Sequence, residues 1–299
     1  MAWSCSLLQR RRSWAITGTP LENKLDDFFA VLRFVHPPLL SGANSSQDVL
    51  DSITPHFLRR TKAEVLPDLP PILTQEIPLE LSEGQSKRYR QIWQRRHQIS
   101  DKQESPRSNN AAALALITEL KQVCNYDNES GESSKLEMLE IIFEKVVAAK
   151  EKILVFSQYV QTLEWILSST KSIPLKCFTG SQSDRERIAN IDWFKESTGP
   201  CGLLISLMAG GVGLNLQEAN SVVMFDMWWN PAVEDQAIQR AHRFGRKEPL
   251  HCWRFRVNGT IEDRIHKILS RKRHEFELFV EGADSAKILD ERTIQELLK

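Results

Sequence analysis

Short apolar runs alternate with helical segments throughout the second half of the chain, and this alternation restricts the fold more than any other feature. Runs rich in β-branched and aliphatic residues predict strands at 153–156, 175–178, 203–206, 221–225 and 251–257. Segments with helical periodicity separate them at 160–167, 184–194 and 230–245. Buried strands that alternate with helices are typical of a parallel sheet covered on both faces. We therefore predict an α/β fold built on a parallel sheet.

Residues that can carry chemistry follow these predicted strands. Ser157, Gly180 and Asp226 each lie at the end of a strand or directly after it, and a glycine-rich loop at 208–215 follows the strand at 203–206. In open parallel sheets, ligands bind beyond the carboxyl ends of the strands. The sequence therefore predicts a functional site at this edge.

The segment 230–245 predicts a helix that carries two aligned arginines. Asn230 is a good N-cap, Pro231 suits the first helical position, and Gly245 fits the position just past the end. The expected apolar face comprises Val233, Ala237, Ala241 and Phe244, and the adjacent edge comprises Gln236, Arg240 and Arg243. Arginines held rigidly can stabilise the charge of a phosphoryl group in transfer. Periodicity alone is equally consistent with a solvated basic edge on a surface helix.

The first half of the chain predicts mainly helices. A short apolar segment at 14–17 resembles a strand, and helical periodicity follows at 21–35. Prolines at 67, 70 and 71 mark a linker, after which 73–81 reads as a strand. Helices are expected at 82–100, 111–124 and 135–150, separated by polar loops at 101–110 and 125–134, and a charged helix is expected from 260 to about 280.

Composition excludes several classes of protein. Lys and Arg together number 39, as do Asp and Glu, so net charge does not indicate a nucleic-acid partner. The five cysteines are scattered without a CxxC pair, which argues against a zinc site or a disulfide framework and favours a reducing, intracellular compartment. No apolar stretch approaches the roughly 20 residues of a membrane span, so we expect no membrane partner.

Several sequence blocks, taken in order, resemble the Swi/Snf-type DNA translocases, a branch of the superfamily-two helicase-like ATPases. The matching blocks are 15–23 (AITGTPLEN, motif III), 57–62 (FLRRTK) with Glu64-Val65 and Leu69-Pro70, 155–158 (VFSQ), Gly180 with Arg187 and Phe194, 204–215 (LISLMAGGVGLN), 226–246 (motif VI and the block before it) and 259–264 (GTIEDR). The resemblance spans nearly all of 14–280. It implies that the sheet is the RecA-like C-terminal lobe of such an ATPase, preceded by helical segments and a remnant of the first lobe.

The resemblance also implies roles for individual residues. Arg240 and Arg243 resemble arginine fingers that reach the triphosphate across a cleft, with Gln236 ordering their network. Gly211, Gly213 and Asn215 resemble a nucleotide-sensing loop. Double-stranded DNA is the implied partner, and its implied contacts are Gln158, Gly180, Ser206, Ala209, Gly210 and a basic segment near the lobe junction made of Arg59, Arg60 and Lys62. Coupling between the lobes is implied for Thr17, Gly18, Thr19, Trp228 and Trp229, although core burial explains at least one of the tryptophans equally well.

Two positions depart from the family pattern. The family usually ends motif VI with Gly-Gln, whereas this chain has Gly245-Arg246. The extra cation either adds a phosphate contact or faces water. The family also commonly has an acidic residue before the first finger, where this chain has Gln239. Neither departure removes a finger.

The sequence contains no Walker A motif, GxxxxGK[ST], and its only Asp-Glu candidate for the acidic motif, in 288–291 (ILDE), is interpreted as a helix start. We therefore expect ATP with Mg²⁺ to be held mainly by a lobe absent from this chain, joined in cis or in trans, and ATP hydrolysis by the chain alone to be negligible. The expected division is 1–72, the end of lobe one with a linker; 73–134, a helical insertion; 135–260, the C-terminal lobe; and 261–299, C-terminal helices. The alternative is a stand-alone DNA-binding or regulatory module, or a truncated inactive product.

Overall fold

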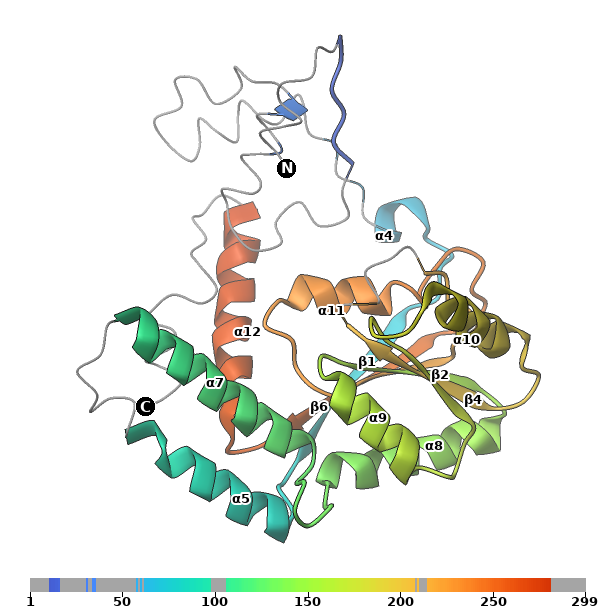
Figure 1. Cartoon of the computed structure of the whole chain (residues 1–299). Coiled ribbons are helices and arrows are strands. Elements are labelled where there is room, and N and C mark those ends of the chain that lie inside the picture. The colour runs from blue at the N-terminus through green and yellow to red at the C-terminus, as the bar shows by residue number, and fades with distance from the viewer. Residues whose placement is uncertain are drawn as a thin grey trace, which may run out of the picture.

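A parallel sheet of six strands organises the protein. The computed structural model describes residues 11–16, 31, 34–35, 58, 60, 62–97, 106–207, 209 and 214–280. The strands are β1 (Ile72–Leu79), β2 (Lys152–Ser157), β3 (Leu175–Phe178), β4 (Cys201–Ser206), β5 (Ser221–Met224) and β6 (Leu250–Val257). Their order is β1-β6-β5-β2-β4-β3, and every neighbouring pair is parallel (Figure 1). The predicted α/β class is confirmed.

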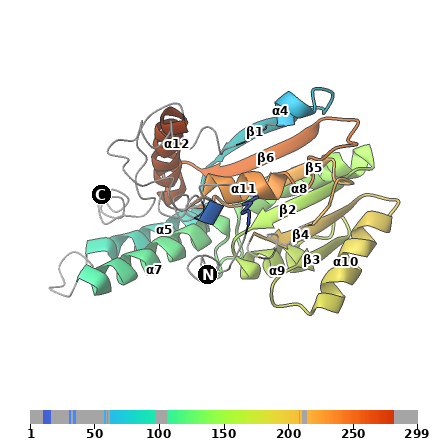
Figure 2. The same ribbon diagram turned by 90° about the horizontal axis from the view of Figure 1, so that it is seen from above.

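Helices cover both faces of the sheet, which explains why its central strands are apolar without alternation. Alternate residues of β2 point to opposite faces: Leu154 and Phe156 join one core, and Ile153 and Val155 join the other. The first core is completed by α10 (Asp184–Glu196) and α11 (Pro231–Ile238), and the second by α8 (Ser134–Ala149) and α9 (Val160–Ser169). Figure 1 shows the sheet between these two layers, and Figure 2 shows it from above, from the side on which α11 lies.

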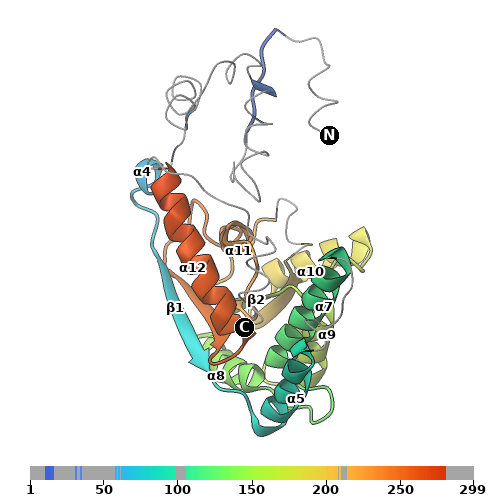
Figure 3. The same ribbon diagram turned by 90° about the vertical axis from the view of Figure 1, so that its left-hand side faces the viewer.

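A third core lies beside one end of the sheet. It is formed by α5 (Glu83–Gln94), α7 (Pro106–Asn125) and α12 (Ile261–Val280), whose buried apolar residues include Ile92, Leu120 and Ile265. Figure 3 shows α5 and α7 running side by side, with α12 to their left. The described residues 62–65 form one further short helix, α4 (Lys62–Val65).

Helix starts follow local capping chemistry. Ser82 and Gln85 form a capping box at the start of α5, and Ser183 and Glu186 form one at the start of α10. The hydroxyl of Ser133 caps α8 by accepting a hydrogen bond from the Leu136 backbone amide at 3.0 Å. These caps fix the starts of α5, α8 and α10 close to where the sequence predicts them, although α5 ends at Gln94, earlier than the predicted end at 100.

Two local predictions were wrong, and one was confirmed. The loop expected at 101–110 ends earlier, because α7 begins at Pro106, and a proline is tolerated in the first turn of a helix. The polar loop expected at 125–134 is present between α7 and α8, and in it the Asp127 carboxylate accepts hydrogen bonds from the Ser130 backbone amide at 3.0 Å and hydroxyl at 2.7 Å. Residues 14–16 form no strand, and Trp14 and Ile16 are exposed.

Strand β1 lies in the segment 73–134 that the sequence groups as a helical insertion. It nevertheless pairs with β6 along its whole length, from Ile72 opposite Leu250 to Leu79 opposite Val257. The helices α5 and α7 therefore emerge directly from an edge strand of the sheet. The proposed domain boundary at 72–73 stays a prediction.

Candidate functional site at the carboxyl ends of the strands

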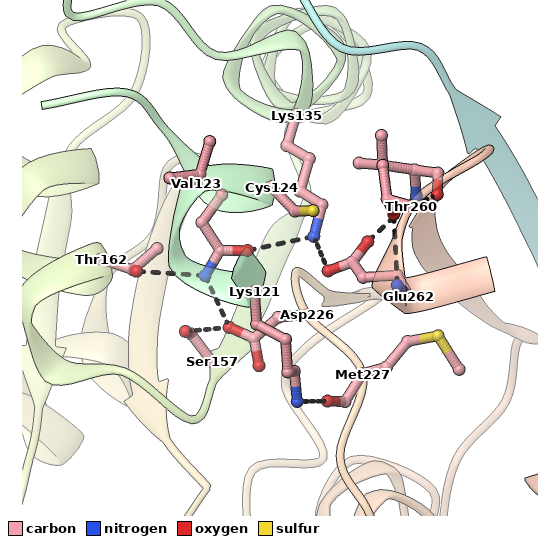
Figure 4. Close-up of polar contacts among 12 residues, drawn as sticks. Lys121, Val123, Cys124, Lys135, Ser157, Thr162, Asp226, Met227, Thr260 and Glu262 are labelled. Carbon is pink, nitrogen blue, oxygen red and sulfur yellow. Dashed lines mark hydrogen bonds and ion pairs between the residues drawn. The ribbon is translucent and has the colours of Figure 1, made fainter. Parts of the chain in front are cut away.

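Asp226, directly after β5, ties three elements together at the carboxyl ends of the strands. It is fully buried. Its carboxylate accepts a hydrogen bond from the Gln158 backbone amide at 3.1 Å. It also accepts hydrogen bonds from the Asn125 side-chain amide at 3.2 Å and from the Ser157 hydroxyl (Figure 4). A buried carboxylate is tolerated when several donors satisfy it. Asp226 therefore fixes the end of β2 and the end of α7 relative to β5.

Gln158 and Gly180, both predicted to track DNA, lie at this edge. Gln158 is half-buried, and its Nε2 donates a hydrogen bond to the carbonyl of Met227 at 3.2 Å. Gly180 is exposed after β3, and a Cβ there would meet no described atom within 4 Å. The loop after β5 thus holds the Gln158 side chain, and the backbone of Gly180 is open to an incoming partner.

The two tryptophans of the loop after β5 anchor it on different cores. Trp228 packs against the core that includes α10 and α11, and Trp229 packs against the core of α5, α7 and α12. The Trp228 backbone amide donates to Glu234 Oε1 at 2.7 Å. Burial raises the pKa of Glu234, and Arg254, 2.6 Å from its carboxylate, opposes that rise. Both tryptophans are half-buried, so a packing role is present for each.

The arginine segment departs from the predicted helix. α11 ends at Ile238, and the chain continues in tighter turns in which the Arg240 amide bonds the Ala237 carbonyl at 3.1 Å and the Ala241 amide bonds the Ile238 carbonyl at 3.0 Å. Gly245 closes the segment with a φ of 93°, a conformation that suits glycine. The prediction that Gln236, Arg240 and Arg243 share one helix edge was therefore wrong. We call residues 239–245 the arginine turn.

Tertiary contacts account for this departure. The Arg240 carbonyl accepts a hydrogen bond from the Leu216 amide at 3.0 Å, and the His242 ring Nε2 bonds the Pro70 carbonyl at 2.7 Å. Ala241 of the expected apolar face is buried, but Phe244 is 78% exposed. The Arg240 carbonyl thus bonds a segment far away in the sequence, and the His242 side chain is held by another.

Three cations gather at the arginine turn. Lys62 Nζ donates to the Gln239 side-chain oxygen and to the His242 carbonyl. Burial and the nearby charge of Arg243 lower the pKa of Lys62 and the pKa of Arg240. Like charges held together repel one another, and an anion among them relieves that repulsion. The arginine turn with Lys62 therefore has the electrostatics of an anion-binding site.

The side chain of Arg246 contacts backbone carbonyls. It is half-buried and donates hydrogen bonds to the carbonyls of Ala219 at 2.6 Å, Glu248 at 2.7 Å and Pro249 at 3.1 Å. Burial lowers its pKa. Neighbouring carbonyls thus engage the guanidinium of Arg246, and a phosphate contact of this residue stays a prediction.

The structure describes some of the remaining predicted site residues and not others. Ser206 and Ala209 are buried, whereas Asn215 and Arg60 are exposed. Leu216, next to Asn215, bonds the Arg240 carbonyl, so the end of the glycine loop lies against the arginine turn. Thr17, Gly18, Thr19, Arg59, Gly210, Gly211 and Gly213 lie outside the described residues. In the part of the chain that the structure describes, no helix is long and apolar enough to cross a bilayer.

Two family models match the chain in succession. The SNF2-related domain matches residues 2–129, and the helicase conserved C-terminal domain matches residues 134–245. The chain belongs to the SWI2/SNF2 family of helicase-like ATPases. Its sheet is the RecA-like C-terminal lobe of that family.

Relatives in the SWI2/SNF2 family are much longer than this chain. An uncharacterized ATP-dependent helicase of Mycoplasma pneumoniae is 33% identical over 278 residues, which cover 86% of this chain and 27% of the relative. The putative ATP-dependent helicase/translocase YwqA of Bacillus subtilis is 30% identical, over 95% of this chain and 34% of the relative. Protein CHROMATIN REMODELING 5 of Arabidopsis thaliana is 30% identical over 86% of this chain and 17% of its own length. The chain thus spans about a third or less of these relatives.

Solved SWI2/SNF2 structures have the same architecture. The Sulfolobus solfataricus SWI2/SNF2 ATPase core in complex with dsDNA has a TM-score of 0.62 and 26% identity, over 94% of this chain and 65% of that chain. The C-terminal domain of the Sulfolobus ATPase alone has a TM-score of 0.59 and 23% identity, over 75% of this chain and 97% of that chain. The second match shows the fold alone, and both agree with the parallel sheet described above.

Sequence reasoning about SWI2/SNF2 motifs missed four polar residues at the strand-end edge: Lys121, Asn125, Lys135 and Glu262. All four are buried. For the two lysines, the helical periodicity of the sequence could have indicated burial. Lys121 lies between Ile117 and Cys124 on the buried stripe of α7, and Lys135 lies one turn before Leu139 on the buried stripe of α8. A charged residue on an apolar stripe is seldom fully buried unless it is paired.

Proposed function

We propose that this chain supplies the second lobe of an ATP-dependent translocase on duplex DNA, with Arg240 and Arg243 as the arginine fingers. The observation that carries the proposal is the cluster of Lys62, Arg240 and Arg243 at the arginine turn, where burial and the charge of Arg243 lower the pKa of Lys62 and of Arg240. A triphosphate placed among these cations relieves their repulsion and gains charge-assisted hydrogen bonds. In phosphoryl transfer, such fingers stabilise the charge of the transition state.

The geometry of the turn supports this role. Catalytic side chains act best when neighbouring contacts hold them in place. Here the backbone of Arg240 is bonded to Leu216, and the His242 ring is bonded to Pro70. Lys62 adds a further link through Gln239, the position where the family commonly has an acid. The segments 62–70 and 214–216 thus fix the turn that carries both arginines.

This chain provides only some of the groups that a site for ATP and Mg²⁺ requires. The three cations suit the triphosphate, and the sequence has no GxxxxGK[ST] loop to cradle it. We propose that a Walker-bearing lobe, in cis or in trans, holds ATP with Mg²⁺, and that the bound nucleotide supplies the phosphoryl group. The residues of this chain orient the fingers and order them against the glycine loop.

The proposed DNA contact is the strand-end edge. A similar ATPase core has been solved with dsDNA. Gln158 and Gly180 lie just after the carboxyl ends of β2 and β3, whereas Ser206 and Ala209, at the end of β4 and after it, are buried. Polar side chains and exposed backbone amides suit phosphate oxygens, which carry no sequence information. We therefore propose sequence-independent contacts with one strand of the duplex, inside a cell where DNA is present.

The test is ATP turnover with and without a Walker-bearing lobe. The purified chain alone is expected to hydrolyse ATP negligibly on duplex DNA. The same chain joined to the ATP-binding lobe of a similar protein is expected to show DNA-stimulated turnover that Arg243→Ala abolishes. Arg185→Ala, which removes an exposed arginine of α10, serves as the matched control and is expected to keep full turnover.

Two outcomes contradict the proposal. Steady-state turnover by the chain alone that Arg243→Ala removes shows that no second lobe is needed. Salt-dependent duplex binding by the joined protein with no response to ATP favours a stand-alone DNA-binding module instead.

A further inference from the structure

A continuous chain of buried polar side chains runs from α12 to the strand-end edge. Glu262, at the start of α12, pairs with Lys135 of α8 at 2.6 Å. Lys135 Nζ also donates to Asn125 Oδ1 at 3.0 Å, and Asn125 Nδ2 donates to Asp226 at 3.2 Å (Figure 4). All four residues are buried. Asp226 in turn holds the Gln158 backbone amide at 3.1 Å.

A second contact from α7 reaches the same loop. Lys121, one turn before Asn125, is fully buried, and its Nζ donates to the Met227 carbonyl at 2.7 Å. The ammonium also lies 4.9 Å from the centroid of the Trp229 ring, within the range of a cation–π interaction. The helix α7 therefore contacts the loop 226–230 at its start, through Asn125, and at its middle, through Lys121.

Burying these groups is a costly way to stabilise a core. Apolar residues of similar size often replace a buried ionic group without loss of stability. Buried, fully satisfied polar networks instead select one geometry among those that a purely apolar core tolerates. Lys121 bonds the backbone of the loop after β5, and Asn125 bonds Asp226, the residue that anchors this loop, as well as Thr162 of α9 and Lys135 of α8.

We propose that Lys121 and Asn125 are positioning residues, through which the α5–α7 helical pair sets the loop 226–230 and Gln158 for contact with DNA. This inference rests on the proposed function, because it takes the strand-end edge as the DNA contact. It assigns the helical pair a part in the site, since α7 fixes backbone groups that lie beside Gln158.

The charges around Lys121 give the proposal a spectroscopic signature. Asp226 after β5, Glu234 of α11 and Glu262 of α12 favour its charged form, while burial and Lys135 of α8 oppose it. Burial dominates and lowers the pKa of Lys121 to about 8. Because this ammonium lies over the Trp229 ring, its deprotonation removes a cation from the face of that indole.

The experiment compares Lys121→Met with Lys176→Met in the full chain. Lys176 lies 4.9 Å from the Trp193 ring, so the control removes a cation at the same distance from an indole, away from the loop. Hydrogen exchange is measured over 226–231 and over α10, and the affinity for a fluorescein-labelled duplex is measured at one fixed salt concentration. Lys121→Met is expected to raise exchange at 226–231 about tenfold relative to α10 and to weaken duplex binding about tenfold, because a charge-assisted hydrogen bond is lost. Lys176→Met is expected to change neither.

If Lys121→Met accelerates hydrogen exchange equally in 226–231 and in α10, Lys121 only stabilises the fold, and this result overturns the inference. Local acceleration with unchanged duplex affinity overturns it as well. A wild-type chain that shows no salt-dependent duplex binding defeats the proposed function itself, and the DNA role of Lys121 with it.

A second measurement does not require a Lys121 variant. The fluorescence of Trp229, obtained as the wild-type signal minus that of Trp229→Phe, is followed from pH 6 to pH 10. A transition near pH 8 is expected. A signal that stays flat across this range contradicts the contact between Lys121 and Trp229 on which the inference depends.

Discussion

Breaking the ion pair between Lys135 and Glu262 is expected to destabilise the fold far more than breaking an exposed pair of equal length. Both side chains are 0% exposed, and Nζ lies 2.6 Å from Oε1. Glu262 also accepts a hydrogen bond from the Val257 amide at 3.0 Å. Lys135→Met removes the cation and leaves this carboxylate buried without its counter-charge. Loss of one partner of a buried pair costs about 3–5 kcal/mol.

The chain offers a matched control. Arg95 and Glu119 are also 2.6 Å apart, but their side chains are 52% and 40% exposed. Exposed pairs of this kind contribute about 0–1 kcal/mol, because water screens the charges and the side chains lose entropy. The two pairs share the same contact distance, so the difference between them isolates the effect of burial.

The assay is a double-mutant cycle by urea denaturation followed by circular dichroism. Lys135→Met/Glu262→Gln removes both charges and keeps an oxygen for the Val257 amide, so it is expected to recover much of the loss caused by Lys135→Met. The coupling free energy is expected to be on the order of 2 kcal/mol or more, against about 1 kcal/mol or less for Arg95→Met/Glu119→Gln. Equal coupling free energies for the two pairs would refute the reasoning from burial.

Two further predictions concern stability. The pKa of Lys121 is lowered from 10.5 to about 8 in the folded state, so between these values the unfolded chain binds more protons and the folded state gains stability as pH rises. The stability of the wild type relative to Lys121→Met, measured by thermal melting, is therefore expected to increase from pH 7 to pH 9.5 by roughly 2 kcal/mol; a difference that is flat or falls with pH contradicts this. Arg246→Ala is expected to destabilise the fold by about 1–3 kcal/mol, because the carbonyls of Ala219 and Pro249 lose their donor, while duplex affinity at fixed salt stays near that of the wild type. A large loss of DNA affinity with unchanged stability would instead support the predicted phosphate contact of Arg246.

The central strands could be predicted because local sequence determines them. A run such as 153–156 is apolar at every position, since both of its faces are buried. The pairing of β1 with β6 could not be predicted, because Ile72 and Leu250 are far apart in the sequence and no local pattern links them. Periodicity likewise predicted too long a helix after Pro231, since contacts with Leu216 and Pro70 determine the conformation of the arginine turn.

In the candidate site, too, some residues could be identified from local sequence and others only from tertiary contacts. Asp226 and Ser157 were identified at strand ends, because the topology of a parallel sheet places them there. The roles of Lys121, Lys135 and Arg246 depend on which carbonyls and carboxylates the fold brings beside them, and these partners come from other elements. Sequence pattern indicated only that two of these cations lie on apolar helix faces.

The role of Arg243 as a finger is tested most directly by the steady-state kinetics of Arg243→Ala in the chain joined to a Walker-bearing lobe, on saturating duplex DNA. A finger acts on the transition state, so kcat is expected to fall by roughly 10³ or more while KM for ATP changes little. Arg185→Ala is expected to leave both constants unchanged. An Arg243→Ala protein that keeps the wild-type kcat, whatever its KM, contradicts the assignment of the arginine turn to the chemistry of ATP hydrolysis.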